Sequence, residues 1–215
     1  MATRALLAEL AAGYRSPVSI ESVGGVDAAR RVAAGESFDV VVLAGDAIDK
    51  LVDAGRVLAG SKVDLVHSGV AVAVPAGTAL PDITSEAAVK HAVLAAPTVG
   101  YSTGPSGVQL AKLFERWGIA QEIAPRIVQA PPGVPVGALV ARGEVALGFQ
   151  QQSELMNIEG IAVVGPLPPA IQITTTFSAG VCAASTQPDA ARALLAFLSS
   201  PDPAATKQRH GMEPA

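Results

Sequence analysis

The amino-acid sequence predicts an α/β protein with two similar lobes, each a mostly parallel sheet flanked by helices. Strand-like apolar runs alternate with amphipathic helical segments along the chain, which is typical of this class. The runs are almost continuously apolar, as expected of strands that are covered on both faces. A linker with two prolines and a glycine, residues 75–82, interrupts the alternation and marks a lobe boundary. The length of 215 residues fits two lobes of roughly 100 residues each.

The first half is predicted to open on a helix, which has Leu6, Leu7 and Leu10 on one face. Gly35 and Gly55 stand directly after two later amphipathic segments, at the position where glycine commonly ends a helix. The elements expected before the linker are a helix at 3–14, a strand at 18–23, a helix at 27–34, a strand at 38–43, a helix that ends near 54 and a strand at 70–74.

After the linker the alternation resumes and predicts a second series of strand and helix units. Pro188 favours the start of a helix, because proline is well tolerated at the first helical position. The expected elements are a helix at 86–95, a strand at 98–101, a helix at 108–117, a strand at 126–129, a helix at 134–141, strands at 147–150 and 171–184, and helices at 188–198 and 204–210, whereas residues 161–169 interrupt the pattern.

The stretch from Val99 to Trp117 combines a short strand, a loop of small residues and an amphipathic helix. Ser102, Thr103 and Ser106 place hydroxyl groups at or near the N-cap of this helix. Free N–H groups and the positive end of the helix dipole make such a position favourable for an anion or a carboxylate. The alternative is an ordinary capped turn between strand and helix, which is more common than a ligand site.

The composition excludes several classes of function. A formal charge of −4 and a pI near 5.3, without any cluster of Lys or Arg, argue against nucleic-acid binding. Cys182 is the single cysteine, and its apolar neighbours indicate a buried, inert thiol. The three histidines have no further ligands at metal-binding spacing, so no metal site is expected. No apolar run is long enough to span a membrane, and residues 1–10 lack the features of a signal peptide.

Several segments resemble the molybdate-binding branch of the bacterial solute-binding proteins, and the resemblance covers nearly the whole chain. The most specific segments are Asp39-Val-Val-Val-Leu with the downstream Asp53-Ala-Gly, the run Arg142-Gly-Glu-Val-Ala-Leu-Gly, and the closing Phe197-Leu-Ser-Ser-Pro. The resemblance implies a periplasmic-binding-protein-like fold in which two crossing strands join the two lobes. Residues 1–76 and 161–215 are then expected to form the first lobe and residues 77–160 the second.

The function that this resemblance implies is closure of the two lobes on a small anion, which loops at helix N-termini would hold. No cofactor is implied. An ABC transporter permease is the protein partner that the family suggests, and the binding protein itself is expected to be a monomer. A periplasmic location follows if a leader was removed or missed, and a cytoplasmic location follows otherwise.

Residues that match the binding loops of the family are the expected ligand contacts. Residues 24–26 match the second binding loop, residues 101–107 match the loop that opens a helix of the second lobe, and residues 133–134 match the next helix N-terminus. Gln151 lies where molybdate binders have a tyrosine, and Thr175 belongs to a threonine-rich strand. The expected ligand-binding residues are Gly24, Gly25, Val26, Tyr101, Ser102, Thr103, Ser106, Gly133, Val134, Gln151 and Thr175.

Two departures from the family pattern bear on the ligand. The glutamine at position 151 replaces the tyrosine that closes on the oxyanion, which weakens the case for molybdate. The family also begins with a central strand and its binding loop, whereas this sequence begins at the helix that follows. Residues 150–153 and 174–176 offer more neutral hydrogen-bonding groups than a compact oxyanion needs, so they suit an organic anion with several functional groups.

An enzyme is the alternative, because a branch of similar general build isomerises aconitate. Moving a double bond next to carboxylates requires a base near the acidic C–H group and donors for the developing enolate. Glu154 and Tyr101 are the candidates for the base, with Ser102 and Thr103 as the donors. The sequence leaves the small-anion binder and the isomerase both open.

Overall fold

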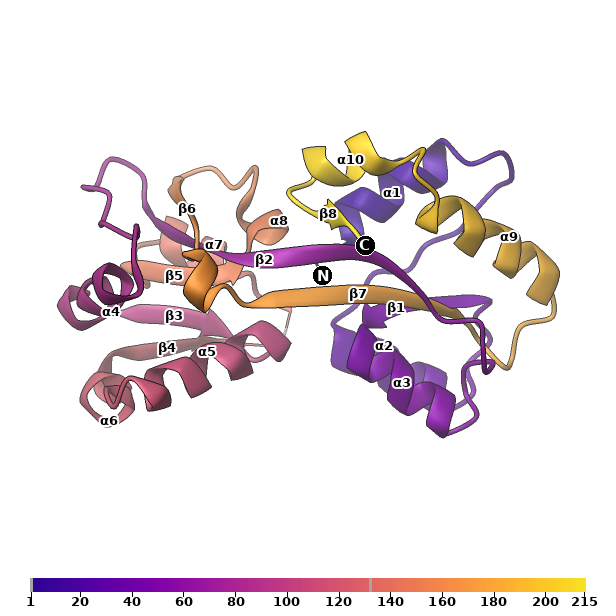
Figure 1. Cartoon of the computed structure of the whole chain (residues 1–215), viewed down its shortest axis with the longest axis horizontal. Coiled ribbons are helices and arrows are strands. Elements are labelled where there is room, and N and C mark those ends of the chain that lie inside the picture. Colours follow the sequence, from indigo (N-terminus) through magenta and orange to yellow (C-terminus); the bar gives the residue numbers. More distant parts are fainter. Residues whose placement is uncertain (1, 132) are drawn as a thin grey trace. The chain divides into compact units, whose positions relative to one another are not determined.

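The structure, a computed structural model, describes residues 2–131 and 133–215. The chain divides into two compact units, which Figure 1 shows with their elements labelled. Unit 1 comprises Met1–Ser68 and Thr175–Ala215, and unit 2 comprises Gly69–Thr174. Two strands, β2 (Val63–Pro75) and β7 (Thr174–Val181), carry the chain across the boundaries between the units.

Unit 1 is built on β1, β7 and the first part of β2. Strand β1 pairs antiparallel with β7, from Val40 opposite Val181 to Ala44 opposite Phe177, and β7 lies next to β2. A short strand, β8, pairs antiparallel with β2 at Val66 and His67. The elements of this unit besides β2 and β7 are α1 (Arg4–Ala12), α2 (Gly25–Ala33), β1 (Val40–Ala44), α3 (Gly45–Asp53), α9 (Pro188–Ser199), α10 (Ala204–Arg209) and β8 (Glu213–Pro214).

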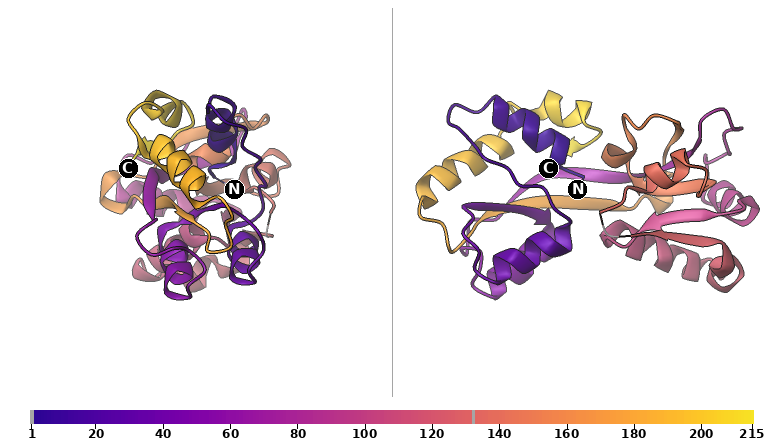
Figure 2. Two further views of the ribbon diagram at one scale, coloured as in Figure 1. Left: turned by 90° about the vertical axis from the view of Figure 1, so that its right-hand side faces the viewer. Right: turned by 180° about the vertical axis from the view of Figure 1, so that it is seen from behind.

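Helices cover both faces of the strands in unit 1. Helices α2 and α3 lie side by side against β1, where Val41 and Leu43 are buried with them (Figure 1). Val40 and Val42 alternate to the other face, where they pack against the core of α1 and α9. Figure 2 shows α1, α9 and α10 along this second face. The apolar run of β1 is therefore explained by burial on both sides, as the sequence predicted.

Residues 17–24 form no strand, although their alternation of apolar and polar residues predicted one. Residues 15–23 make no backbone hydrogen bond to any residue that the structure describes. An alternating segment becomes a strand only when a neighbour supplies backbone partners, and the one strand neighbour described for β1 is β7. Ile20 is consequently 40% exposed and Val23 38% exposed.

Unit 2 contains the parallel part of the sheet. Strand β5 runs parallel to β3, and β3 runs parallel to β4, whereas β2 pairs antiparallel with both β5 and β6. The elements are α4 (Glu86–Ala95), β3 (Val99–Ser102), α5 (Pro105–Arg116), α6 (Ala120–Ile123), β4 (Ile127–Ala130), α7 (Val136–Ala141), β5 (Leu147–Gln151), α8 (Gln152–Leu155) and β6 (Ile161–Pro166), with 3-10 turns at Ala124–Arg126 and Pro169–Ile171.

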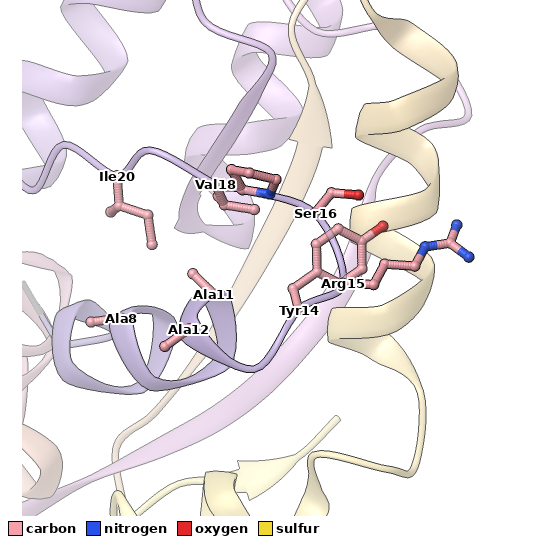
Figure 3. Close-up of a pocket in the computed structure, with 9 residues that line it drawn as sticks. Ala8, Ala11, Ala12, Tyr14, Arg15, Ser16, Val18 and Ile20 are labelled. Atoms are coloured by element: carbon pink, nitrogen blue, oxygen red, sulfur yellow. The ribbon is translucent and has the colours of Figure 1, made fainter.

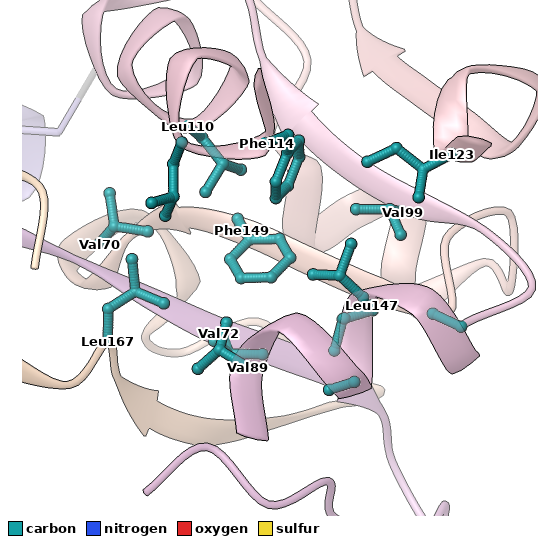
Figure 4. Packing of buried hydrophobic residues seen from close by; sticks show 14 of the residues in the cluster. Val70, Val72, Val89, Val99, Leu110, Phe114, Ile123, Leu147, Phe149 and Leu167 are labelled. Atoms are coloured by element: carbon teal, nitrogen blue, oxygen red, sulfur yellow. The ribbon is translucent and has the colours of Figure 1, made fainter. Parts of the chain in front are cut away.

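The two faces of the parallel strands are packed differently. Val99, Leu147 and Phe149 are buried against α4 and α5, in the cluster that Figure 4 shows. Gly148 points to the opposite face, where an added Cβ atom would lie 2.6 Å from Val140 of α7. This glycine lets α7 pack directly on the sheet. Helices on both faces position the loops that follow β3, β4 and β5.

The α/β class is confirmed, but the prediction of mostly parallel sheets is wrong. The sheet is mixed, because β2 and β7 run antiparallel to the strands with which they are paired in the described residues.

The predicted helix at 86–95 is observed with the same bounds, whereas the strand expected at 171–184 spans only 174–181. Strand β6 pairs with β2 inside unit 2, although residues 161–166 were expected in the first lobe. The assignment of residues 1–76 and 161–215 to one lobe and 77–160 to the other stays a prediction.

Candidate functional site

The loops that follow β3, β4 and β5 lie at one edge of unit 2. Tyr101 of β3 stands opposite both Phe149 of β5 and Gln129 of β4. Because the three strands are parallel, their carboxyl ends lie at the same edge of the sheet, which is where open α/β sheets bind ligands. The predicted site residues at this edge are Ser102, Thr103, Ser106, Gly133, Val134, Gln151 and Glu154.

Helix α5 begins at this edge, as the sequence predicted for the segment after Tyr101. Gly104 is the N-cap in an extended conformation, and its N–H group donates to Ser102 Oγ over 3.4 Å. The N–H groups of Ser106 and Gly107 have no partner among the described residues, because the first turn of a helix lacks internal acceptors. Ser106 is only 6% exposed, and no described residue shares a hydrogen bond with its hydroxyl group. The edge therefore offers unpaired donors.

Gly107 lets the first turn of α5 pack onto the end of β3. A Cβ atom at this position would lie 1.7 Å from the carbonyl oxygen of Ser102 and 2.8 Å from its carbonyl carbon. No side chain fits at such a distance, so only glycine permits this approach. The close packing fixes the loop that carries Ser102 and Thr103 relative to the helix.

Gln150, near the end of β5, belongs to the glutamine-rich run that the sequence offered as hydrogen-bonding groups, although it was not among the expected ligand-binding residues. Its side chain is 3% exposed, and its Oε1 atom accepts hydrogen bonds from Val136 N over 2.8 Å and Gly137 N over 3.4 Å. The glutamine thus caps the N-terminus of α7 from within the protein. Helix α7 begins at Val136, two residues later than predicted, so Val134 lies in the preceding turn.

Tyr101 packs its ring beside the first turn of α5, where its Cδ2 atom would lie 3.2 Å from a Cβ atom at Gly107. Its ring lies 6.1 Å from that of Phe114 in an edge-on arrangement, and it lines a pocket of about 290 Å³ beside α5 and α6. Burial raises the pKa of the Tyr101 hydroxyl above its usual value. The phenol is therefore protonated near neutral pH and is poorly suited to act as a base.

Glu154 is the one titratable side chain in the sequence of the three segments 102–106, 130–136 and 150–154. It lies in α8, directly after β5, and is half-buried. Glu154 thus stays the titratable candidate at this edge of the sheet.

The remaining predicted ligand residues belong to unit 1. Gly24 is the N-cap of α2, Gly25 is its first residue, and Val26 is 83% exposed. No described residue accepts a hydrogen bond from the N–H groups of Gly25 and Val26. Thr175 lies in β7 and is half-buried. The start of α2 is thus a second exposed helix N-terminus, considered within unit 1 alone.

A groove of about 630 Å³ in unit 1 runs between α1 and residues 14–20 (Figure 3). Alanines of α1 line one side, and the segment from Tyr14 to Ile20 lines the other. None of the predicted ligand residues borders it, and Arg15 is its single charged lining residue. We therefore place the candidate site at the strand edge of unit 2.

Other chemistry has little support in the described residues. Burial, together with the nearby Asp39 carboxylate, raises the pKa of the Cys182 thiol to about 11, so the thiol stays protonated near neutral pH. No three His, Cys, Asp or Glu side chains gather as metal ligands would within residues 2–131 and 133–215. In the same part of the chain, every helix is too short or too polar to cross a bilayer.

The chain belongs to the bacterial extracellular solute-binding proteins, a family that it matches over residues 1–213. The expected resemblance is thereby confirmed, and membership implies a small-molecule ligand. The chain is 43% identical over 185 residues to an aconitate isomerase from a Pseudomonas species, which covers 86% of this chain and 70% of that enzyme.

Two solved structures illustrate the fold. The periplasmic molybdate-binding protein of Azotobacter vinelandii superimposes with a TM-score of 0.79 at 19% identity, over 98% of this chain and 94% of that one. A periplasmic thiamin-binding protein superimposes with a TM-score of 0.73 at 17% identity, over 99% of this chain and 78% of that one. At these identities the likeness concerns the fold and does not identify the ligand.

Proposed function

We propose that this chain is an isomerase that shifts a double bond in an unsaturated polycarboxylate such as aconitate. The observation that carries the proposal is the 43% identity to an aconitate isomerase over 86% of the chain. The molybdate-binding protein of the same fold is only 19% identical. In this proposal the two units are lobes that close on the substrate, and the residues at the strand edge of unit 2 form one wall of the site.

The reaction is an allylic proton transfer. Aconitate carries three carboxylates and a methylene group next to a carbon–carbon double bond. A base removes a proton from the methylene carbon, the double bond moves to that carbon, and a proton is added to the former vinylic carbon. The product is aconitate again, with a newly formed double bond that can have the other geometry. The developing negative charge is delocalised onto a carboxylate, which needs hydrogen-bond donors.

The strand edge supplies both requirements. Ser102, Thr103 and Ser106 provide hydroxyl donors, and the first turn of α5 adds unpaired N–H groups. In our proposal Glu154 is the base, since Tyr101 is held protonated by burial. Gly24 to Val26, at the N-terminus of α2 in unit 1, stay predicted anion ligands.

The proposal is tested by incubating the purified chain with cis-aconitate in deuterated water and following the reaction by NMR. We expect trans-aconitate to form with deuterium incorporated at carbon. Glu154→Gln should lower kcat by about 100-fold or more, because general-base catalysis contributes about 10²–10⁴. Glu159→Gln, which makes the same charge change at an exposed position five residues later, should retain activity. Absence of isomerisation by the wild-type chain would overturn the proposal.

A second candidate is a binding protein that delivers a small anion to an ABC transporter permease. Membership of the solute-binding family favours it. This function predicts that molybdate, tungstate or a carboxylate raises the melting temperature of the chain without turnover. Stabilisation by molybdate or tungstate alone, with no effect of either aconitate isomer, would favour the transport function over the isomerase.

A further inference from the structure

The orientation of the Gln150 amide is fixed by the backbone of α7. Both Val136 and Gly137 donate their N–H groups to one atom of the Gln150 side chain, and only the carbonyl oxygen can accept them. The opposite orientation would place an NH₂ group against two N–H donors. The Nε2 atom of Gln150 must therefore point away from the α7 N-terminus.

This Nε2 group has no hydrogen-bond partner among the described residues, although Gln150 is 97% buried. The only unpaired side-chain polar atom that is sealed from solvent in the described residues is Ser153 Oγ. The Nε2 atom of Gln150 is also unpaired but is not among the solvent-inaccessible atoms, so part of it is accessible to solvent. An almost buried NH₂ group whose two N–H bonds have no acceptor lowers the stability of the fold, unless a ligand or water accepts these bonds.

The solvent-accessible Nε2 atom lies at the functional edge. Gln150 is the penultimate residue of β5, which is parallel and adjacent to β3, and Ser106 follows β3 in the first turn of α5. Ser106 is likewise almost buried and lacks a hydrogen-bond partner among the described residues. Ser106 in α5 and Gln150 in β5 are thus two nearly buried polar side chains of unit 2 that both have unused hydrogen-bonding capacity.

We propose that Gln150 is a substrate-binding residue whose Nε2 group donates hydrogen bonds to a carboxylate of the substrate. This inference rests on the proposed function for the identity of the ligand, whereas the presence of the donor rests on the geometry. Because the Gln150 carbonyl oxygen is held by α7, only the NH₂ group of the amide faces the ligand, and this group can donate hydrogen bonds but not accept them. The position therefore favours ligands with an oxygen acceptor and disfavours ligands that offer an N–H or O–H group there.

Gln150→Glu separates ligand binding from the cap of α7. One oxygen of the new carboxylate still accepts from Val136 and Gly137, and a negative charge at a helix N-terminus is favourable. The other oxygen replaces the NH₂ group, so the donor is lost and the anion is repelled. We expect the unliganded variant to melt at or above the temperature of the wild-type chain, and its affinity for the anion to fall at least about tenfold.

The measurement is a thermal melt of each protein with cis-aconitate, trans-aconitate, citrate and molybdate. The wild-type chain should gain about 5–10 °C at 100 times the dissociation constant of a bound anion, and Gln150→Glu should lose this gain. Gln129→Glu makes the same charge change at an exposed position of β4 and should keep the gain. Loss of the gain in both variants would assign the effect to net charge and overturn the role of Gln150.

The remaining outcomes separate the two proposals. If only molybdate stabilises the wild-type chain and Gln150→Glu abolishes this effect, the isomerase proposal and the assignment of the ligand to a carboxylate fail, whereas Gln150 remains a donor to an anion. If an aconitate isomer stabilises both proteins equally, Gln150 is only a helix cap. If none of the four anions stabilises the wild-type chain, both proposals are overturned.

Discussion

Gly107 is the glycine of the candidate site at which an added side chain has the least space. We expect Gly107→Ala to destabilise the protein by about 1–3 kcal/mol, because the added methyl group overlaps the carbonyl group of Ser102 and forces the helix away from the strand. The measurement is urea-induced unfolding, with the isomerase assay on the folded variant.

Gly104→Ala is the matched control. Its backbone is in the extended region, and the nearest atom to an added Cβ would be Ser102 Oγ at 3.6 Å. This variant should unfold at nearly the same urea concentration as the wild-type chain. Equal destabilisation by both substitutions would show that the loop is sensitive to any side chain, and it would contradict the claim that overlap with the Ser102 carbonyl group destabilises Gly107→Ala.

At the residue scale the sequence predicted the hydroxyl loop but not the orientation of its neighbours. Ser102, Thr103 and Ser106 lie within two residues of the N-cap, which is Gly104, but none of their side chains caps the helix. Tyr101 stays a predicted candidate for the base; the sequence did not indicate that its ring lies edge-on to Phe114. The sequence offered Gln150 only as a hydrogen-bonding residue; that it caps α7 could not be predicted, since this depends on which backbone N–H groups the fold brings to β5.

At the scale of elements, Glu86 ties α4 to α5. Its Oε1 atom accepts from Trp117 Nε1 over 2.6 Å and from Arg116 Nη2 over 2.7 Å. The hydrogen bond from Trp117 is the main cause that lowers the pKa of Glu86 below its ordinary value of 4.5, and Arg116 adds to the effect. The carboxylate is needed in its charged form for both contacts.

The pH dependence of this contact has a defined sign. A carboxyl group whose pKa is lower in the folded state stabilises the fold above its unfolded-state pKa, and this contribution is lost as pH falls through the folded-state value. We expect wild type to be more stable than Glu86→Gln at pH 7 and the difference to shrink below about pH 4.5. Urea unfolding at several pH values measures it. Glu115→Gln, at an exposed position of α5, should show no such trend.

The elements themselves were largely predictable, with one instructive failure. Helix α4 and the strands of unit 2 follow from apolar periodicity and from glycine and proline positions, which are local signals. The segment 17–24 has the period of a strand but no backbone partner, and a partner is a property of the fold rather than of the segment. The antiparallel course of β2 and β7 was missed for the same reason.

At the scale of the whole molecule, two strand crossings connect the two compact units. If the units are lobes that close on a ligand, the radius of gyration should fall when an anion that raises the melting temperature is added. Small-angle X-ray scattering with and without that anion measures the change. An unchanged radius of gyration at saturating ligand would argue that binding occurs without closure of the lobes.

Trp117, which donates a hydrogen bond to Glu86, also provides an intrinsic fluorescence probe. Trp117 is the only tryptophan of the chain, and its ring lies 5.9 Å from Phe114 in the core of unit 2. Its fluorescence therefore reports on unit 2, whereas circular dichroism sums the helices of both units. A red shift of emission that precedes or follows the loss of ellipticity would reveal units that melt separately, and coincident curves would reveal a single cooperative transition.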